Sequence, residues 1–134
     1  MTWKAVHVSQ TSSASPSTVC AFAGDPANLP LWAAGLSAGI RRVSDRWFTD
    51  SPMGQVEVAF TGPIDLGILD HDVTLPDGTV VHNPVRVLRN DAGAEIVFTA
   101  YQRDGMTDAE FESDVATVRA DLARLRDLLE AAGQ

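Results

Sequence analysis

The chain has 134 residues, and 10 Lys and Arg against 18 Asp and Glu give it a formal net charge of −8 at pH 7. This length indicates one domain, residues 1–134, with a core large enough to fold without disulfides. A single cysteine, Cys20, excludes the disulfide-scaffold and zinc-finger classes. The acidic charge disfavours nucleic acid and membrane partners. Without an apolar leader or a run of about 20 apolar residues, the protein is expected to be cytoplasmic.

The N-terminal part predicts one strand followed by two short helices. Residues 3–11 alternate around apolar positions, as a strand with one buried face does. Ser15-Pro16 combines a capping residue with a proline suited to the first helical turn, which predicts a short helix through Phe22. Asp25-Pro26 repeats this signal and predicts a second short helix that ends before Pro30.

The middle of the chain predicts six further strands. Turn sequences such as Pro76-Asp77-Gly78 separate the apolar runs, and the short connections favour antiparallel pairing. The expected strands cover residues 39–44, 46–50, 54–61, 66–75, 79–89 and 94–102.

A long helix is expected after these strands. Thr107 and Glu110 have the spacing of a capping box, which satisfies backbone N–H groups at a helix start. The apolar residues that follow recur at spacings of three and four, which is typical of a helix with one buried face. They are Phe111, Val115, Val118, Leu122, Leu125 and Leu129.

Together these elements predict an α+β fold. A seven-stranded curved antiparallel sheet would wrap around the long C-terminal helix, with the two short helices between the first and second strands. One helix of ~10 Å diameter cannot fill the trough of a strongly curved sheet of long strands. We therefore expect a cavity between the sheet and the helix.

This order of elements resembles the START-like, or SRPBCC, superfamily and its helix-grip fold. The resemblance covers nearly the whole chain. Its local signs are Ser15-Pro16 to Phe22, Leu31-Trp32, residues 67–73, Arg86-Val87, and Asp121-Leu122 with Leu125 and Leu129-Glu130. The last pattern is similar to small bacterial members grouped as polyketide cyclase/dehydrase-like. The resemblance implies a cavity for a small hydrophobic or aromatic ligand more strongly than it implies a reaction.

His71 and Arg86 are the candidate catalytic residues. If Asp77-Gly78 forms a two-residue turn, His71 lies opposite Pro84, and His71, His82 and Arg86 share one face of the hairpin. On a cavity wall, Arg86 would act on a substrate carbonyl or enolate as a fixed cation and His71 as an acid or base.

Two alternatives to this arrangement stay open. Both side chains could lie at the solvated rim of the sheet. A bulge at Pro84 would also turn Arg86 outward and bring Val85 and Val87 inside. The other polar residues of the hairpin are expected on the solvated outer face: Asp70, Asp72 and Asn83.

Aromatic side chains are spread over the elements that should line the trough. Trp32, where pockets of the family open, and Trp47 could stack on a planar ligand, with ordinary core packing as the alternative. The ligand-binding candidates are Trp32, Trp47, Phe60, His82, Phe98 and Phe111. The histidines lack the spacing of a metal site, and the chain has no phosphate-binding loop, so neither a metal nor a nucleotide cofactor is expected.

Two classes of function are therefore compatible with the sequence. The first is a protein that binds a small hydrophobic or aromatic molecule, with cyclisation or dehydration of a polyketide-like substrate as a further step. The second is a protein-interaction module, toxin-like or an assembly factor, whose cavity is vestigial and whose acidic surface recognises a basic partner. An open sheet edge could also support a homodimer.

Overall fold

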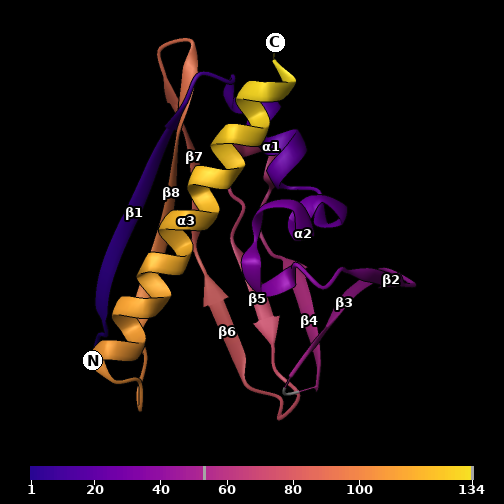
Figure 1. The fold of residues 1–134 in the computed structure, drawn as a ribbon, viewed down its shortest axis with the longest axis vertical. Coiled ribbons are helices and arrows are strands. Elements are labelled where there is room, and N and C mark those ends of the chain that lie inside the picture. Colours follow the sequence, from indigo (N-terminus) through magenta and orange to yellow (C-terminus); the bar gives the residue numbers. More distant parts are fainter. Residues whose placement is uncertain (53, 134) are drawn as a thin grey trace.

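The computed structural model describes residues 1–52 and 54–133, and its architecture is α+β (Figure 1). The described strands are β1 (Lys4–Ser12), β2 (Arg41–Val43), β3 (Arg46–Ser51), β4 (Gly54–Phe60), β5 (His71–Thr74), β6 (Val80–Asn83), β7 (Val85–Asn90) and β8 (Gly93–Gln102). The α-helices are α1 (Pro16–Ala23), α2 (Leu29–Trp32) and α3 (Asp108–Ala132). The 3₁₀ helices are η1 (Pro26–Asn28), η2 (Ala34–Leu36) and η3 (Ile64–Leu66).

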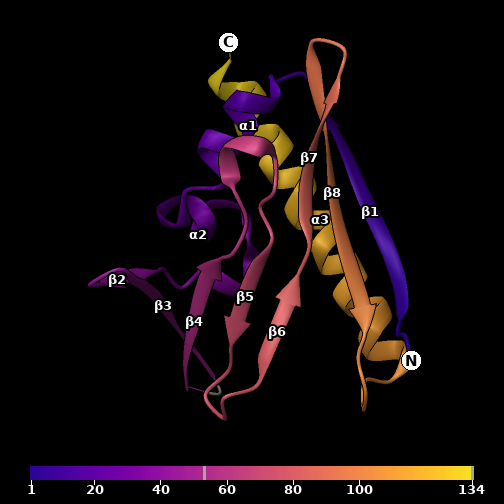
Figure 2. The same ribbon diagram turned by 180° about the vertical axis from the view of Figure 1, so that it is seen from behind.

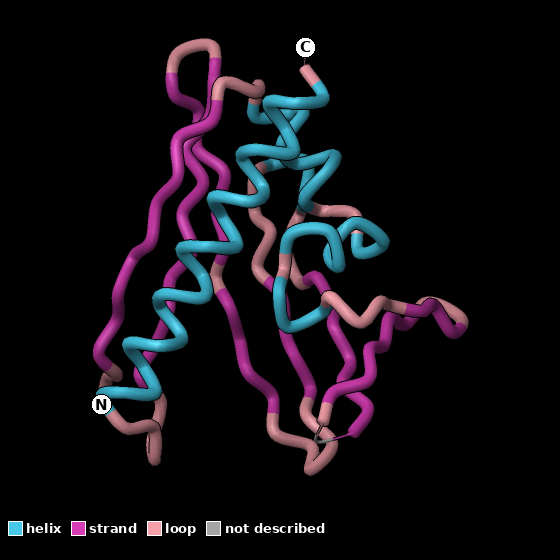
Figure 3. The backbone as a smooth tube through the Cα atoms, viewed as in Figure 1, coloured by secondary structure: helices cyan, strands magenta, loops and turns pink. Residues whose placement is uncertain are grey.

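The helix-grip arrangement expected from the sequence is confirmed. The long helix α3 crosses the strands beside β1 and β8, with α1 and α2 next to its C-terminal half (Figure 1). Viewed from behind, the strands lie in front of the helices (Figure 2), and the backbone trace in the first orientation shows the helices on the near side of the strands (Figure 3). The N-terminus lies near the start of α3, and the C-terminus lies near α1 at the other end of the molecule.

The helix boundaries follow their local signals with one exception. Ser15 caps α1 by accepting a hydrogen bond from the backbone of Thr18, and Thr107 and Glu110 form the expected capping box of α3. The second short helix was expected to end before Pro30. Instead it begins as η1 and continues into α2, because Pro30 occupies the first turn, where a missing N–H costs nothing.

The strands form two sheets instead of one seven-stranded sheet. Their orders are β1-β8-β7 and β2-β3-β4-β5-β6. The expected strand 79–89 is divided at Pro84 into β6, which pairs with β5, and β7, which pairs with β8. The carbonyl of Pro84 accepts a hydrogen bond from Thr99 N–H, but proline has no N–H to return, so the ladder with β8 ends there.

The expected strand 66–75 is shorter than predicted. Its first residue belongs to η3, and Gly67 then adopts a left-handed conformation with φ of 84°. Regular pairing in β5 starts only at His71. An isolated bridge between Ile68 and Arg86 connects this segment to β7, so the two sheets remain joined along the chain.

The β5–β6 hairpin has a different register from the one predicted. Its loop contains three residues, Pro76-Asp77-Gly78, because Leu75 N–H donates to the Thr79 carbonyl at 2.8 Å and Gly78 has a φ of 88°. His71 consequently pairs with Asn83 instead of Pro84. A shift of one residue moves every side chain to the other face of a strand.

This register changes which side chains lie on each face of the β5–β6 hairpin. Val85 and Val87 are buried, whereas the Arg86 side chain is 51% exposed on the outer face, as the bulge alternative proposed. The pairing runs past Pro84 without a bulge, since Leu69 N–H donates to the Val85 carbonyl at 2.8 Å. The register alone therefore turns Arg86 outward. His82 also lies outside, while Asn83 shares the inner face with His71.

The hydrophobic core lies between the sheets and the helices. The apolar stripe of α3 supplies its buried residues Phe111, Val118, Leu122, Leu125 and Leu129, and only Val115 of the predicted set is partly exposed. The opposing strand residues include Val8, Val58, Leu69 and Ile96, and α1 adds Val19 and Cys20. Among the described residues, no helix combines the length and apolar composition needed to cross a bilayer.

Candidate functional site

The candidate site is a small enclosed cavity where the two sheets, α3 and the short helices meet. Its volume is about 10 Å³, which is at the lower limit for one water molecule. The lining residues come from seven elements and the chain that leads into β5: Ala23 of α1, Leu29 and Trp32 of α2, Phe60 of β4, Leu69 before β5, His71 of β5, Val85 and Val87 of β7, Ile96 of β8 and Leu125 of α3. The surface that these residues present to the cavity is apolar, although Trp32 and His71 also carry polar ring nitrogens.

His71 lies between two aromatic rings on the inner face of the sheet. Its ring meets Phe60 edge-on at a centroid distance of 5.6 Å and Phe98 at 6.2 Å. Its Nδ1 lies 3.1 Å from the Leu69 carbonyl, which can only accept a hydrogen bond, so Nδ1 carries the proton and Nε2 keeps a lone pair. Burial lowers the pKa of His71, and the hydrogen bond to Leu69 opposes this only in part.

Trp32 is the other polar residue of the cavity wall. The residue is 5% exposed, and its indole Nε1 is the one buried side-chain nitrogen or oxygen in the described part of the chain that lacks a hydrogen-bond partner. Buried polar groups in native proteins are almost always paired with protein or with ordered water. The indole N–H of Trp32 is therefore a buried hydrogen-bond donor without an acceptor among the described residues.

The short helices that cover the cavity are attached to α3 by two polar side chains. The Arg124 guanidinium donates to the Trp32 carbonyl at 2.8 Å, and the Asp121 carboxylate accepts a hydrogen bond from Ala34 N–H at 3.2 Å. The same carboxylate oxygen lies 3.2 Å from Nη1 of Arg124. Burial raises the pKa of Asp121, although Ala34 and Arg124 act in the opposite direction. We call these four residues the cover latch.

A second polar cluster lies on the outer face, behind the cavity. Asp70 was expected to be solvated, but it is 7% exposed and accepts two hydrogen bonds from Arg86, each 2.9 Å long. This pairing holds the pKa of Asp70 below its ordinary value. His82 donates from Nδ1 to the Asp72 carboxylate at 2.6 Å, and its Nε2 lies 3.8 Å from Asp70. His71 and Arg86 therefore do not face a common cavity.

The remaining aromatic candidates are divided among three places. Trp47 lines a separate groove of about 240 Å³ near η3, and Phe60 lines both this groove and the enclosed cavity. Phe98 borders the site through His71. Phe111 is buried at the start of α3 under Lys4, whose Nζ lies 5.8 Å from the ring centroid, and it does not line the cavity.

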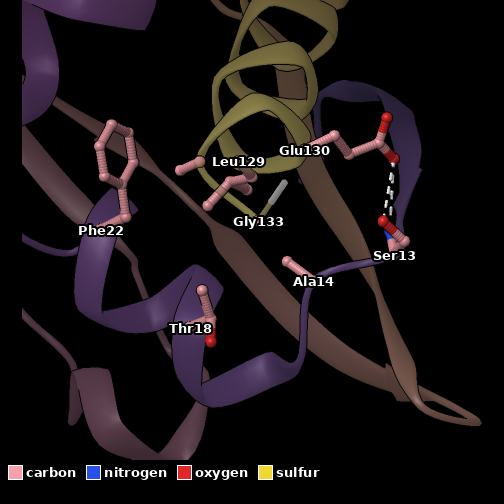
Figure 4. Close-up of a pocket in the computed structure, with 8 residues that line it drawn as sticks. Ser13, Ala14, Thr18, Phe22, Leu129, Glu130 and Gly133 are labelled. Carbon is pink, nitrogen blue, oxygen red and sulfur yellow. Dashed lines mark hydrogen bonds between the residues drawn. The ribbon is translucent and has the colours of Figure 1, made fainter.

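Larger surface grooves occur elsewhere. One of about 530 Å³ lies between α1 and the end of α3, where Phe22 and Thr18 face Leu129 and Gly133 (Figure 4). Glu130 closes one side of it by accepting hydrogen bonds from Ser13 N–H and Oγ at 3.4 Å. Residues 1–52 and 54–133 contain no group of three or more metal-binding side chains.

Sequence reasoning missed the latch and much of the cavity wall. Leu125 was visible as part of the apolar stripe, and Val85 and Val87 were named only as the consequence of a bulge. Asp121 and Arg124 looked like the solvated back of an amphipathic helix. Their partners are backbone groups 87 to 92 residues away, which no local pattern indicates.

Comparison with known proteins supports the fold. No family model and no curated protein matches the chain. The chain is similar to the crystal structure of Ara h 8.0201, with a TM-score of 0.64 and 11% identity over 96% of this chain and 98% of that one. The Aha1 dimer from Colwellia psychrerythraea gives a TM-score of 0.70 with 16% identity, over 95% and 96% of the two chains.

A third similar structure is DynU16, a protein in the dynemicin biosynthetic locus. It gives a TM-score of 0.69 with 18% identity over 96% of this chain, and this chain spans 48% of its length. At these identities the likeness shows the helix-grip fold. Membership of the START-like superfamily and of the polyketide cyclase/dehydrase-like group stays a prediction.

Proposed function

We propose that the protein binds a small hydrophobic or aromatic molecule in the enclosed cavity. The observation that carries this proposal is an apolar cavity at the junction of sheet, α3 and short helices, lined in part by Trp32, whose buried indole N–H has no partner among the described residues. Apolar walls with a few polar groups are the usual composition of small-molecule sites. The helix-grip fold of the similar structures agrees with this role.

Binding requires the cavity to enlarge, because about 10 Å³ does not hold an aromatic ring. The cover is the element that can move: α2 has four residues and is flanked by the 3₁₀ helices η1 and η2. It is attached to α3 through Arg124 and Asp121 rather than through a long helical interface. Opening of the latch would enlarge the cavity while the sheets stay in place.

The experiment is native mass spectrometry of the freshly purified protein, followed by thermal shift with aromatic polyketides, flavonoids, fatty acids and sterols. A ligand that binds only the folded state stabilises it by RT ln(1 + [L]/Kd), so the midpoint should rise with ligand concentration along this curve. A retained small molecule or such a concentration-dependent shift supports the proposal. A protein that is empty and insensitive to all four classes contradicts it.

A reaction at the same site is the narrower proposal. The neutral His71, with a lone pair on Nε2, could abstract a proton from a polyketide-like substrate. The fixed-cation role suggested for Arg86 would require its guanidinium to leave Asp70 and the outer face. Loss of turnover of an identified substrate in His71→Ala, with retained binding, supports this step. Unchanged turnover contradicts it.

The rival function is a protein-interaction module. It is favoured by the small cavity and the net charge of −8, which would attract a basic partner. Such a module should copurify with a protein and ignore apolar ligands. A homodimer is a related proposal, motivated by the similar Aha1 dimer and by the outer strands β1 and β2 of the two sheets. Sedimentation equilibrium over a range of concentrations tests it.

A further inference from the structure

The free edge of β1 is long and regular. β1 ends the sheet order β1-β8-β7 and lies at the outer margin of the molecule in both ribbon views (Figures 1 and 2). Its nine residues include no proline, and its register with β8 runs without a bulge from Lys4 to Ser12. Sheet edges are usually protected by short length, proline, bulges or charged side chains, because an open edge is a template for pairing. Beyond Lys4, β1 has none of these features.

The other described edges of the two sheets are protected. β2 has three residues, and two of them are arginines. β6 has four residues and is followed directly by Pro84. The outer edge of β7 is occupied by the segment before β5, since Leu69 N–H donates to the Val85 carbonyl at 2.8 Å. Among residues 1–52 and 54–133, β1 therefore presents the longest edge that nothing covers.

The pairing with β8 determines which residues of β1 present their backbone to this edge. Consecutive residues of an antiparallel strand direct their N–H and C=O groups to opposite sides. Thr99 N–H donates to the Pro84 carbonyl on the β7 side of β8, so Phe98 is bonded to β1 through its partner Val8. The even-numbered residues of β1 thus bond with β8. The odd-numbered ones direct their N–H and C=O groups to the free edge: Ala5, His7, Ser9 and Thr11.

We propose that the free edge of β1 pairs antiparallel with the same edge of a second copy of the chain, with Val8 on the two-fold axis. In this register Ala5 lies opposite Thr11 of the second copy and His7 lies opposite Ser9 of the second copy. All four open residues of each strand are then hydrogen-bonded, whereas any other register of open residues leaves at least one of them unpaired. This inference rests on the proposed homodimer and names the surface that forms it.

The charges at the two ends of β1 match in this register. Lys4 lies opposite Ser12 of the second copy, one residue from Ser13, whose N–H and Oγ donate to Glu130 at 3.4 Å. Two-fold symmetry therefore places Lys4 of one copy near Glu130 of the other at both ends of the interface. Between these ends, β1 carries no Asp, Glu, Lys or Arg that would oppose pairing.

Ser9→Pro tests the edge while it leaves the ladder between β1 and β8 intact. Ser9 N–H is directed to the free edge, where a proline is tolerated in the monomer but removes a donor of the interface. Ser9→Thr is the matched control, because it keeps the N–H. By two-fold symmetry two hydrogen bonds are lost, so sedimentation equilibrium should give a dissociation constant about tenfold or more higher for Ser9→Pro than for Ser9→Thr.

Charge reversal tests the register. Lys4→Glu and Glu130→Lys should each weaken the dimer, since each brings like charges together at both ends of the interface. The double variant should restore the affinity, and it keeps the net charge of −8, so a change in overall charge does not explain the recovery. A double variant that dimerises as weakly as the single ones overturns the proposed register.

The unaltered protein provides a measurement that does not depend on the folding of a variant. Amide hydrogen exchange should slow with rising protein concentration at Ala5, His7, Ser9 and Thr11, and not at the even-numbered residues, which β8 already protects. If a dimer forms but these four amides stay unprotected, or Ser9→Pro dimerises as well as Ser9→Thr, the inference is overturned while the homodimer stands. If the protein is monomeric at every concentration, the homodimer and the inference both fail.

Discussion

The carboxylate of Asp70 accepts two hydrogen bonds from the guanidinium of Arg86, each 2.9 Å long, on the outer face of the hairpin. The same carboxylate accepts the N–H of Val85, and this leaves the Leu69 carbonyl to the imidazole of His71. The outer cluster and the cavity are therefore connected through one strand pair. We therefore expect substitutions of Asp70 to alter the hydrogen bonding of His71 as well as the stability of the protein.

Asp70→Ala should destabilise the protein by about 1–3 kcal/mol, because it leaves the buried Val85 N–H without its acceptor. Arg86→Gln should cost about 0–1 kcal/mol, since the guanidinium is half exposed. Urea unfolding at pH 7 measures both. Because Arg86 lowers the pKa of Asp70 from 3.8, the Asp70 contribution is present above that pH and lost as the pH falls below it. Equal losses in the two variants would contradict this ordering.

His71 should make the free energy of unfolding depend on pH near 6.5, in addition to the dependence below pH 3.8 that is expected from Asp70. Burial lowers its pKa below 6.5, so the unfolded chain takes up a proton more readily than the folded one. Stability is then fully present above pH 6.5 and decreases as the pH falls through 6.5 toward the folded pKa. The nearby His82 strengthens this effect, while Asp70 and Asp72 weaken it.

His71→Phe should lose this part of the pH dependence. The measurement is the difference in urea midpoint between pH 7.5 and pH 5.5, compared with the unaltered chain. His7→Gln is the control, because His7 is exposed and its ring contacts Thr99 on the outer face. If His71→Phe shows the same pH dependence as the unaltered chain and as His7→Gln, the assignment to His71 is wrong.

Arg124→Met should loosen the cover by removing the donor to the Trp32 carbonyl. We expect faster amide hydrogen exchange in residues 33–36 and faster ligand association, with little change in the exchange of β8. Arg126→Met is the control, since Arg126 pairs with Asp127 on the same helix and is not bonded to the cover. Equal exchange at the cover in both variants would show that Arg124 does not hold it closed.

Leu125→Ala should cost about 2–5 kcal/mol, because the side chain is fully buried and lines the cavity. The same substitution enlarges the cavity, so naphthalene should stabilise this variant more than it stabilises the unaltered chain. Leu128→Ala, at a partly buried position outside the cavity lining, is the matched control. A thermal shift no larger in Leu125→Ala than in the control would contradict the placement of the ligand.

The parts of the fold with local signals could be predicted from the sequence. The capping box at Thr107 and Glu110 and the stripe that follows define α3 without tertiary information. The register of the β5–β6 hairpin could not be derived, because Asp77-Gly78 suits both a two-residue turn and the last two positions of a three-residue loop. The difference of one residue in the length of this loop determines which face of the hairpin Arg86 occupies.

The candidate site was predictable only in part, for a related reason. Trp32 and His71 stood out as residues of the right type, and the structure places both in one wall. Trp47 and Phe111 were equally plausible candidates from the sequence. Trp47 instead lines a separate groove, and Phe111 is buried under Lys4 at the start of α3. Which aromatic residues meet depends on how distant elements pack, and a periodic pattern carries no information on that.

The pairing of β1 with β8 has a consequence for how the chain is made. Lys4 pairs with Gln102 and Ser12 with Ala94, so β1 is synthesised well before its pairing partner β8. At ~5–20 residues per second, synthesis of the intervening chain takes about 5–20 s, during which the edge of β1 has no neighbour. Contacts of such high sequence separation slow folding. Until β8 has been synthesised, the backbone N–H and C=O groups of β1 therefore lack the strand with which they pair in the folded sheet.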